Sequence, residues 1–123
     1  MHKEWEPCFV LHTRAFSDTS LIADIFSLNH GRMSVLAKGA KKPKSKYFGH
    51  LMPFRNVRLT FSGKSDLKTL NEIDSSLIDH GNSNQLSTYS YLYINELLLK
   101  ILPQHIPNKE LFHLYQAFVD SFT

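Results

Sequence analysis

Cysteine is nearly absent from this chain of 123 residues, because Cys8 is the only one. A single thiol excludes an internal disulfide and any zinc site built from cysteine pairs, and it favours a reducing compartment. No stretch approaches the roughly 18 apolar residues that a membrane span needs, and the N-terminal residues lack the apolar core of a signal peptide. We therefore expect a cytoplasmic protein without membrane contact.

Acidic residues are missing from the middle of the chain. Between residues 25 and 65 there is no Asp or Glu, whereas nine Lys and Arg residues fall in that window. The flanking segments, 1–24 and 66–123, carry net charges of −2 and −4. The overall charge of +3 therefore conceals one strongly basic block between two acidic ends. Polyanions are the natural partners of such a block.

Motifs that indicate catalysis or metal binding are also lacking. The seven histidines are scattered, and no H-x-x-x-H pair is present to ligate a metal. Gly63-Lys64-Ser65 resembles the end of a P-loop, but the motif requires a glycine at the position of Arg58. A hairpin turn is the simpler interpretation. We expect no catalytic residue, no metal site and no cofactor.

The first two thirds of the chain has the alternation of β-strands. Five short runs alternate apolar and polar side chains, and Gly31 and the segment 62–66 mark hairpin turns. Strict alternation in the first run separates two faces, one with Phe9, Leu11 and Thr13 and the other with Val10, His12 and Arg14. Five strands without an intervening helix fit a small antiparallel barrel or sandwich.

The last third has apolar residues at helical spacing. Pro103 ends the first predicted helix, and Asn108 is placed to cap a second one. Two helices cannot bury so many apolar positions by themselves. We therefore expect that the chain is the front part of a longer protein, or that a partner covers these helices. The predicted domains are 1–80, a β domain, and 81–123, the start of a helical domain.

The basic block is densest in AKGAKKPKSKYFGH, residues 37–50, which holds five lysines within nine positions. A solvated charged loop is the ordinary interpretation. Further basic residues extend the charge onto the neighbouring strands, and aromatic residues beside the lysines can stack on unpaired bases. Lysines bind phosphates as point charges, so we expect nucleic-acid binding that is independent of sequence. The candidate residues are Arg32, Lys38, Lys41, Lys42, Lys44, Lys46, Tyr47, Phe48, Arg55 and Arg58.

Two blocks, FVLHTRAFSDTSLIADIFSLNHGRMSVLAKGAKKPKS and LMPFRNVRLTFSGKSDLKTL, resemble the amino-terminal part of the RecO family of bacterial DNA-repair and recombination mediators. YLYINELLLKILP and ELFHLY resemble the first helices of that family's second domain. The resemblance implies a mostly β fold, a five-stranded OB-fold barrel followed by α-helices that begin a helical domain. It also implies DNA contacts at the basic positions named above, and it adds Arg14 to them.

The same resemblance implies a function. It implies binding of single- and double-stranded DNA and annealing of complementary strands in DNA repair. It further implies cooperation with RecR and single-strand binding protein in loading the RecA recombinase, in the cytoplasm and at the nucleoid. The contact with single-strand binding protein would belong to a part of the helical domain that these residues do not include. The four-cysteine zinc site of some family members has no counterpart here, since only Cys8 is present.

Two other hypotheses remain open at the level of sequence. An OB-type barrel can serve as a protein-interaction module, in which the apolar helices dock a partner protein and the basic loop is secondary. The same barrel can bind RNA, because charge alone does not distinguish RNA from DNA.

Overall fold

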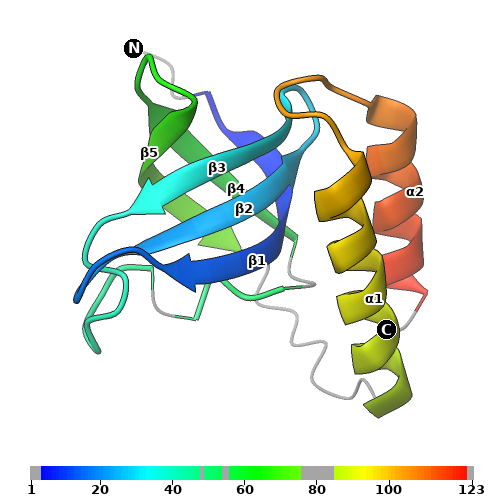
Figure 1. Cartoon of the computed structure of the whole chain (residues 1–123), viewed down its shortest axis with the longest axis horizontal. Helices are drawn as coiled ribbons and strands as arrows, with labels where there is room; N and C mark the ends of the chain where they lie inside the picture. The colour runs from blue at the N-terminus through cyan, green and yellow to red at the C-terminus, as the bar shows by residue number, and fades with distance from the viewer. Residues whose placement is uncertain (1–3, 48, 54–55, 76–84, 122–123) are drawn as a thin grey trace.

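The computed structural model describes residues 4–47, 49–53, 56–75 and 85–121. Five strands are followed by two helices: β1 (Glu6–Ala15), β2 (Leu21–Ser27), β3 (Gly31–Ala37), β4 (Asn56–Ser62), β5 (Leu67–Ser75), α1 (Gln85–Ile101) and α2 (Lys109–Asp120). The strands curl into a barrel, and both helices lie along one flank of it (Figure 1). Among the described residues, no helix has the length and apolar character needed to cross a membrane.

The barrel closes in the strand order β1-β2-β3-β5-β4. Four of the pairings are antiparallel, whereas β3 and β5 run parallel, with Ser34 opposite Leu67. A closed five-stranded barrel with this strand order is an OB-fold. The predicted OB-fold barrel followed by helices is therefore confirmed. The expectation of a fully antiparallel barrel is wrong at one pair, because β5 returns beside β3 to close the barrel.

The interior of the barrel is filled by apolar side chains from all five strands. Val10, Ile25, Val35, Leu59 and Leu70 belong to one cluster of buried residues. Cys8 packs in the same cluster as a small apolar residue, and burial, with the nearby Glu6 as a second cause, raises the pKa of its thiol.

A β-bulge in β1 changes which of its side chains face outward. The register with β2 shifts between Val10 and His12, and Phe9 and Leu11 pack outside the barrel, against the helices. Strict alternation placed His12 and Arg14 on the face opposite Phe9. That expectation is wrong, because the extra residue of a bulge reverses the parity of the strand beyond it. His12 and Arg14 therefore lie on the outer face as well.

A second apolar cluster joins the barrel to both helices. Phe9 of β1 lies with its ring centroid 5.3 Å from that of Phe112 and 4.7 Å from that of Tyr115, both on α2. Phe26 of β2 makes an edge contact with Phe112 at 5.5 Å. These aromatic contacts hold α2 against the outer face of β1 and β2.

One buried amide links three elements at this boundary. The side chain of Asn95, on α1, donates to the carbonyl oxygen of Leu11 in β1 at 3.3 Å. Its oxygen accepts from the hydroxyl of Tyr115 on α2 at 2.5 Å. Both polar ends of the amide are thereby satisfied where water has no access, which is the condition for burying such a group. Burial also raises the pKa of the Tyr115 hydroxyl.

The segment between the helices is fixed to the start of β3. Helix α1 ends before Pro103, and the side chain of Asn108 accepts from the backbone N–H of Leu111 at 3.1 Å, so both predicted helix boundaries are confirmed. The backbone N–H of His105 donates to the carbonyl oxygen of Arg32 at 2.8 Å.

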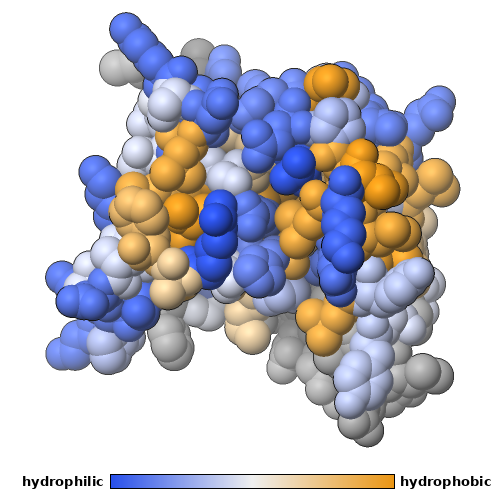
Figure 2. Space-filling model, viewed as in Figure 1, coloured by the Kyte–Doolittle hydropathy of each residue, from blue (hydrophilic) through white to orange (hydrophobic). Residues whose placement is uncertain are grey.

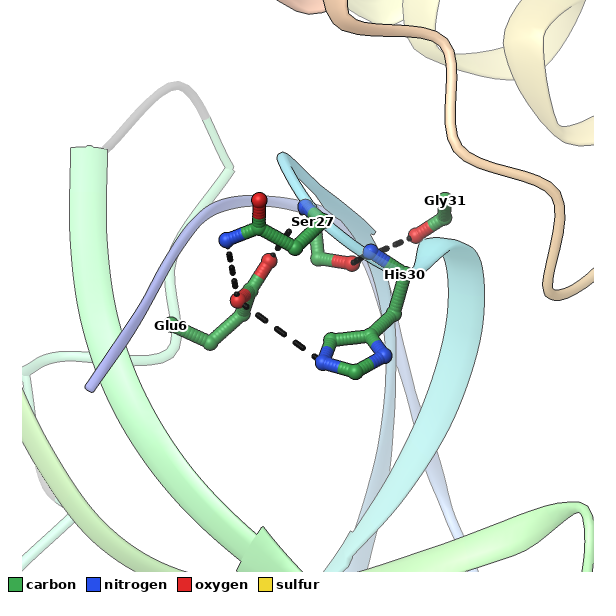
Figure 3. Close-up of polar contacts among 5 residues, drawn as sticks. Glu6, Ser27, His30 and Gly31 are labelled. Atoms are coloured by element: carbon green, nitrogen blue, oxygen red, sulfur yellow. Dashed lines mark hydrogen bonds and ion pairs between the residues drawn. The ribbon is translucent and has the colours of Figure 1, made fainter. Parts of the chain in front are cut away.

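The turn between β2 and β3 is held by a buried carboxylate (Figure 3). Glu6 accepts from the backbone N–H of Asn29 at 2.6 Å and from its side-chain amide at 2.9 Å. The hydroxyl of Ser27 donates to the carbonyl oxygen of Gly31 at 2.9 Å and accepts from the backbone N–H of His30 at 3.2 Å. This turn therefore has a defined geometry where it meets the segment between the helices.

Candidate nucleic-acid interface

The lysine loop, residues 38–46, leaves the barrel at the end of β3. Its five lysines are exposed, and none of the ion pairs among the described residues involves them. In Figure 2, hydrophilic residues gather at the corner of the molecule where Figure 1 shows this loop. Ammonium groups that form no ion pair with a described carboxylate give this loop a positive potential that attracts phosphate.

The first half of the lysine loop is tied to the β1–β2 loop, residues 16–20. The backbone N–H of Lys41 donates to the carbonyl oxygen of Thr19 at 2.9 Å. Its ammonium group lies 3.3 Å from the carbonyl oxygen of Ser17, and the backbone N–H of Gly39 donates to the hydroxyl of Ser20 at 3.3 Å. The two loops therefore form one surface at this end of the barrel.

Tyr47 anchors the other end of the lysine loop to the barrel. Its ring is only 5% exposed, and its hydroxyl donates to the carbonyl oxygens of Leu70 and Asn71 at 3.0 and 3.3 Å. A ring buried in this way offers no free face to a base, so the structure does not support the expectation that Tyr47 stacks on DNA. Phe48 and Arg55, also predicted to contact DNA, lie outside the described residues.

Two of the predicted arginines are engaged elsewhere. The Nε of Arg32 donates to the carbonyl oxygen of Leu102 at 2.8 Å, at the end of β3 opposite to Lys38. Arg58 pairs with Asp74 at 2.9 Å and lies 4.7 Å from the centroid of the Trp5 ring. Arg32 therefore holds parts of the fold together. Arg58 makes its ion pair at the surface, where more than half of its side chain is exposed, and its contact with DNA stays a prediction.

Arg14 remains part of the candidate interface. It lies at the end of β1, directly before the β1–β2 loop, and more than half of its side chain is exposed. Its Nε is 3.6 Å from a carboxylate oxygen of Asp24, which partly offsets the positive potential around the guanidinium group. The basic surface that the fold assembles is therefore the lysine loop with Arg14.

Sequence reasoning missed one residue of this surface. Phe16, in the β1–β2 loop, is 57% exposed and follows Arg14 by two positions. The available signal was an aromatic residue directly before the Ser17-Asp18 turn, at the end of a predicted strand.

The described residues around the lysine loop offer cationic groups and no cluster of metal ligands. Within the described part of the chain, no group of three or more His, Cys, Asp or Glu side chains is placed to hold a metal ion. Gly63-Lys64-Ser65 forms the hairpin between β4 and β5, as predicted, and the hydroxyl of Ser65 donates to the carbonyl oxygen of Leu67 at 2.8 Å. The candidate site is a set of exposed ammonium groups on a loop of the closed barrel.

Comparison with known proteins places this barrel in a family. The family model described as "Recombination protein O N terminal" matches residues 1–77. A protein named DNA repair protein RecO from Glaesserella parasuis is 40% identical over 115 residues, which cover 94% of this chain and 48% of the relative. Proteins of the same name from Alteromonas mediterranea and Hamiltonella defensa are 39% and 43% identical, over 95% and 94% of this chain and 50% and 49% of theirs.

The chain thus spans about half the length of the curated relatives that it matches. The family match covers the whole barrel, including the lysine loop, and the similarity to the relatives continues through most of both helices. The barrel, its basic loop and this match lead to one conclusion: the protein belongs to the RecO family.

Proposed function

We propose that this protein binds single- and double-stranded DNA through the lysine loop and Arg14, and that it promotes annealing of complementary strands. The observation that supports this most directly is the set of five exposed lysines, none paired with a carboxylate in the described part of the chain, on a barrel of a DNA-repair family. OB-folds commonly bind oligonucleotides through one face and its flanking loops.

Annealing then follows from electrostatics. Ammonium groups beside phosphates release condensed counterions and lower the repulsion between two strands, so that bases can meet and pair. No bond is formed or broken, and no cofactor is required. Binding of this kind weakens steeply as salt concentration rises.

The test is a titration of a labelled single-stranded oligonucleotide, followed by fluorescence anisotropy at several salt concentrations. A variant with Lys41, Lys42, Lys44 and Lys46 replaced by Glu should lose most of its affinity. The matched control carries the same four charge reversals at Lys64, Lys68, Lys100 and Lys109. Since each phosphate contact on a single strand contributes about 0.7 to the log–log salt slope, four lost contacts should lower the slope by about 3. Equal affinity of the two variants would refute the assignment.

We further propose, from family membership, a role as recombination mediator. In this role the full-length protein acts with RecR to load RecA onto DNA coated by single-strand binding protein. The test measures RecA filament formation on such DNA, with RecR present, for the full-length parent and for the lysine variant. Loading by the variant at the parental rate would contradict a role for the lysine loop.

A specific observation also favours protein docking by α1. Tyr89, Tyr93, Leu97 and Ile101 recur every four residues along this helix, and all four are exposed. Exposed apolar surface of this extent often marks a protein interface. Sedimentation of the chain over a range of concentrations tests this second function. Association that is lost on replacing Tyr93 and Leu97 by Asp would support protein docking by α1.

RNA binding is tested by titrating matched RNA and DNA oligonucleotides in the anisotropy experiment described above.

A further inference from the structure

We propose that Phe16 is the stacking platform for one unpaired base of the DNA that the lysine loop holds. This inference rests on the proposed DNA binding and goes further, because it names the residue that distinguishes single strands from duplex. The lysines account for attraction to phosphate, but they give no preference between the two forms. An exposed ring beside the phosphate site supplies that preference.

The β1–β2 loop presents Phe16 in a fixed position. The backbone N–H of Phe16 donates to the carbonyl oxygen of Ser20 at 3.0 Å. Inside the same turn, the hydroxyl of Ser17 accepts from the backbone N–H groups of Ser20 and Thr19 at 3.1 and 3.4 Å. A loop closed by its own hydrogen bonds loses little conformational freedom when a ligand binds, so it retains more of the interaction free energy.

The lysine loop fixes where a phosphate would lie relative to this ring. Lys41 reaches into the β1–β2 loop through its backbone N–H, which bonds to Thr19, and through its ammonium group, which bonds to Ser17. Phe16 is the next residue before Ser17. A backbone phosphate beside Lys41 would therefore have its own base, or an adjacent one, next to the Phe16 ring. Asp18 is the one acid in this loop, and it favours a phosphate path on the lysine side.

The ring of Phe16 is open to a ligand. Within the part of the chain that the structure describes, none of the ring-to-ring contacts involves Phe16, and its exposed fraction is high. Other aromatic residues of the described barrel are engaged: Phe9 and Phe26 lie beneath the helices, and Tyr47 lies in the core. Phe16 thus takes the place that the sequence assigned to Tyr47.

Stacking of this kind has a distinct signature. Bases in a duplex are already stacked on their neighbours, whereas an unpaired base is free to stack on a ring. The stacking contribution releases no counterions, so it persists when salt screens the lysines. We therefore expect the contribution of Phe16 to the preference for single-stranded over duplex DNA to be the same at low and at high salt concentration.

The experiment compares Phe16→Ala with a matched control, Met52→Ala, in the full chain. Met52 follows the lysine loop and is similarly exposed, so both variants remove an exposed apolar side chain close to it. Three labelled probes are titrated at two salt concentrations: an ordinary single strand, a strand of abasic residues of the same length and charge, and a duplex of the same length. Circular dichroism verifies that both variants remain folded.

Phe16→Ala should weaken binding of the ordinary strand by about 5- to 150-fold, the range found for loss of one base–aromatic contact. It should leave the abasic strand, the duplex and the salt slope unchanged. Phe16→Trp should retain the parental affinity, and Met52→Ala should behave as the parent. If Phe16→Ala binds the ordinary strand with the parental affinity, and this binding still depends on salt, the stacking role alone is overturned. Absence of salt-dependent binding by the parent would overturn the DNA-binding function and the stacking role together.

Discussion

The guanidinium Nε of Arg32 lies 2.8 Å from the carbonyl oxygen of Leu102, so a residue at the start of β3 holds the residue that directly follows α1. The backbone carbonyl of the same arginine accepts from His105, and Gly31 lies directly beneath Ile106. One short piece of β3 therefore positions the whole segment between the helices. A positive charge that sequence reasoning assigned to DNA is used inside the fold.

Replacing Arg32 by Met should separate these two roles. Met keeps the apolar stem but has no donor, so the carbonyl of Leu102 loses its charged partner. The free energy of unfolding should fall by about 1–3 kcal/mol, the cost of such a loss. Lys42→Met, which removes the same charge from the lysine loop, should leave stability unchanged and weaken DNA binding. Urea denaturation and oligonucleotide titration of both variants provide the measurements. A fall in affinity for Arg32→Met equal to that for Lys42→Met would place Arg32 in the interface after all.

Gly31 and Gly49 offer a matched pair for the contact between β3 and the helices. Both have a positive φ, 73° and 82°. A Cβ on Gly31 would lie 2.2 Å from the carbonyl oxygen of Ile106, whereas nothing lies within 4 Å of the corresponding position on Gly49. Gly49→Ala should therefore cost only the backbone term, about 1–2 kcal/mol. Gly31→Ala should cost clearly more, because the backbone at Ile106 must move away. Equal midpoints in urea would show that the contact contributes nothing.

Tyr47→Phe examines the anchor of the lysine loop. The hydroxyl donates to two carbonyl oxygens of β5, at 3.0 and 3.3 Å, so its removal should lower the free energy of unfolding by about 0.5–1.5 kcal/mol. Thermal denaturation of parent and variant measures this. If Tyr47 were instead exposed for base stacking, loss of its hydroxyl would not change the stability of the protein. An unaltered melting temperature would therefore restore the predicted stacking of Tyr47 on DNA.

Stability should decrease at alkaline pH. Burial raises the pKa of the Cys8 thiol and of the Tyr91 and Tyr115 hydroxyls above their ordinary ranges. The folded state therefore keeps protons that the unfolded state releases. This stabilisation is fully present below the ordinary pKa, about 8.5 for a thiol and about 10 for a phenol. Above it, stability is lost by about 1.4 kcal/mol per pH unit for each group.

Cys8→Ala isolates one of these protons. The variant leaves a small cavity, which lowers stability at every pH, but the slope between pH 9 and 10 should be shallower than that of the parent by about one proton. Urea denaturation in closely spaced buffers yields both slopes. Parallel curves for the two proteins would show that the thiol does not contribute.

The elements that could be predicted from the sequence are those set by local chemistry. The hairpin at Gly31 needs a positive φ, and Asn108 caps the helix that follows it. Pro103 ends α1 because proline cannot continue a helix. Alternation of apolar residues found the strands, but it failed within β1, since nothing in the local sequence indicates the bulge that reverses the strand beyond it.

The residues of the candidate site could be predicted only where their exposure does not depend on a partner distant in the sequence. Lysines in a loop remain exposed, so their position in the chain was enough. Arg58 is opposed by Asp74, which lies 16 residues away in the sequence, and Tyr47 finds its acceptors on β5. Closure of the barrel brings such partners together. The distribution of residues along the chain does not show which side chains will meet. Phe16 was missed because its exposure is set by the conformation of the β1–β2 loop, which the order of residues along the chain does not show.

The bulged strand β1 has one further consequence, for where this chain can be divided. Its residues Phe9 and Leu11, with Phe26 of β2, face outward and are covered only because α1 and α2 pack over them. A recombinant fragment that ended at residue 77, where the family match stops, would expose this aromatic patch to water and would associate through it. The end of the family match and the end of the folding unit therefore lie at different points of the chain.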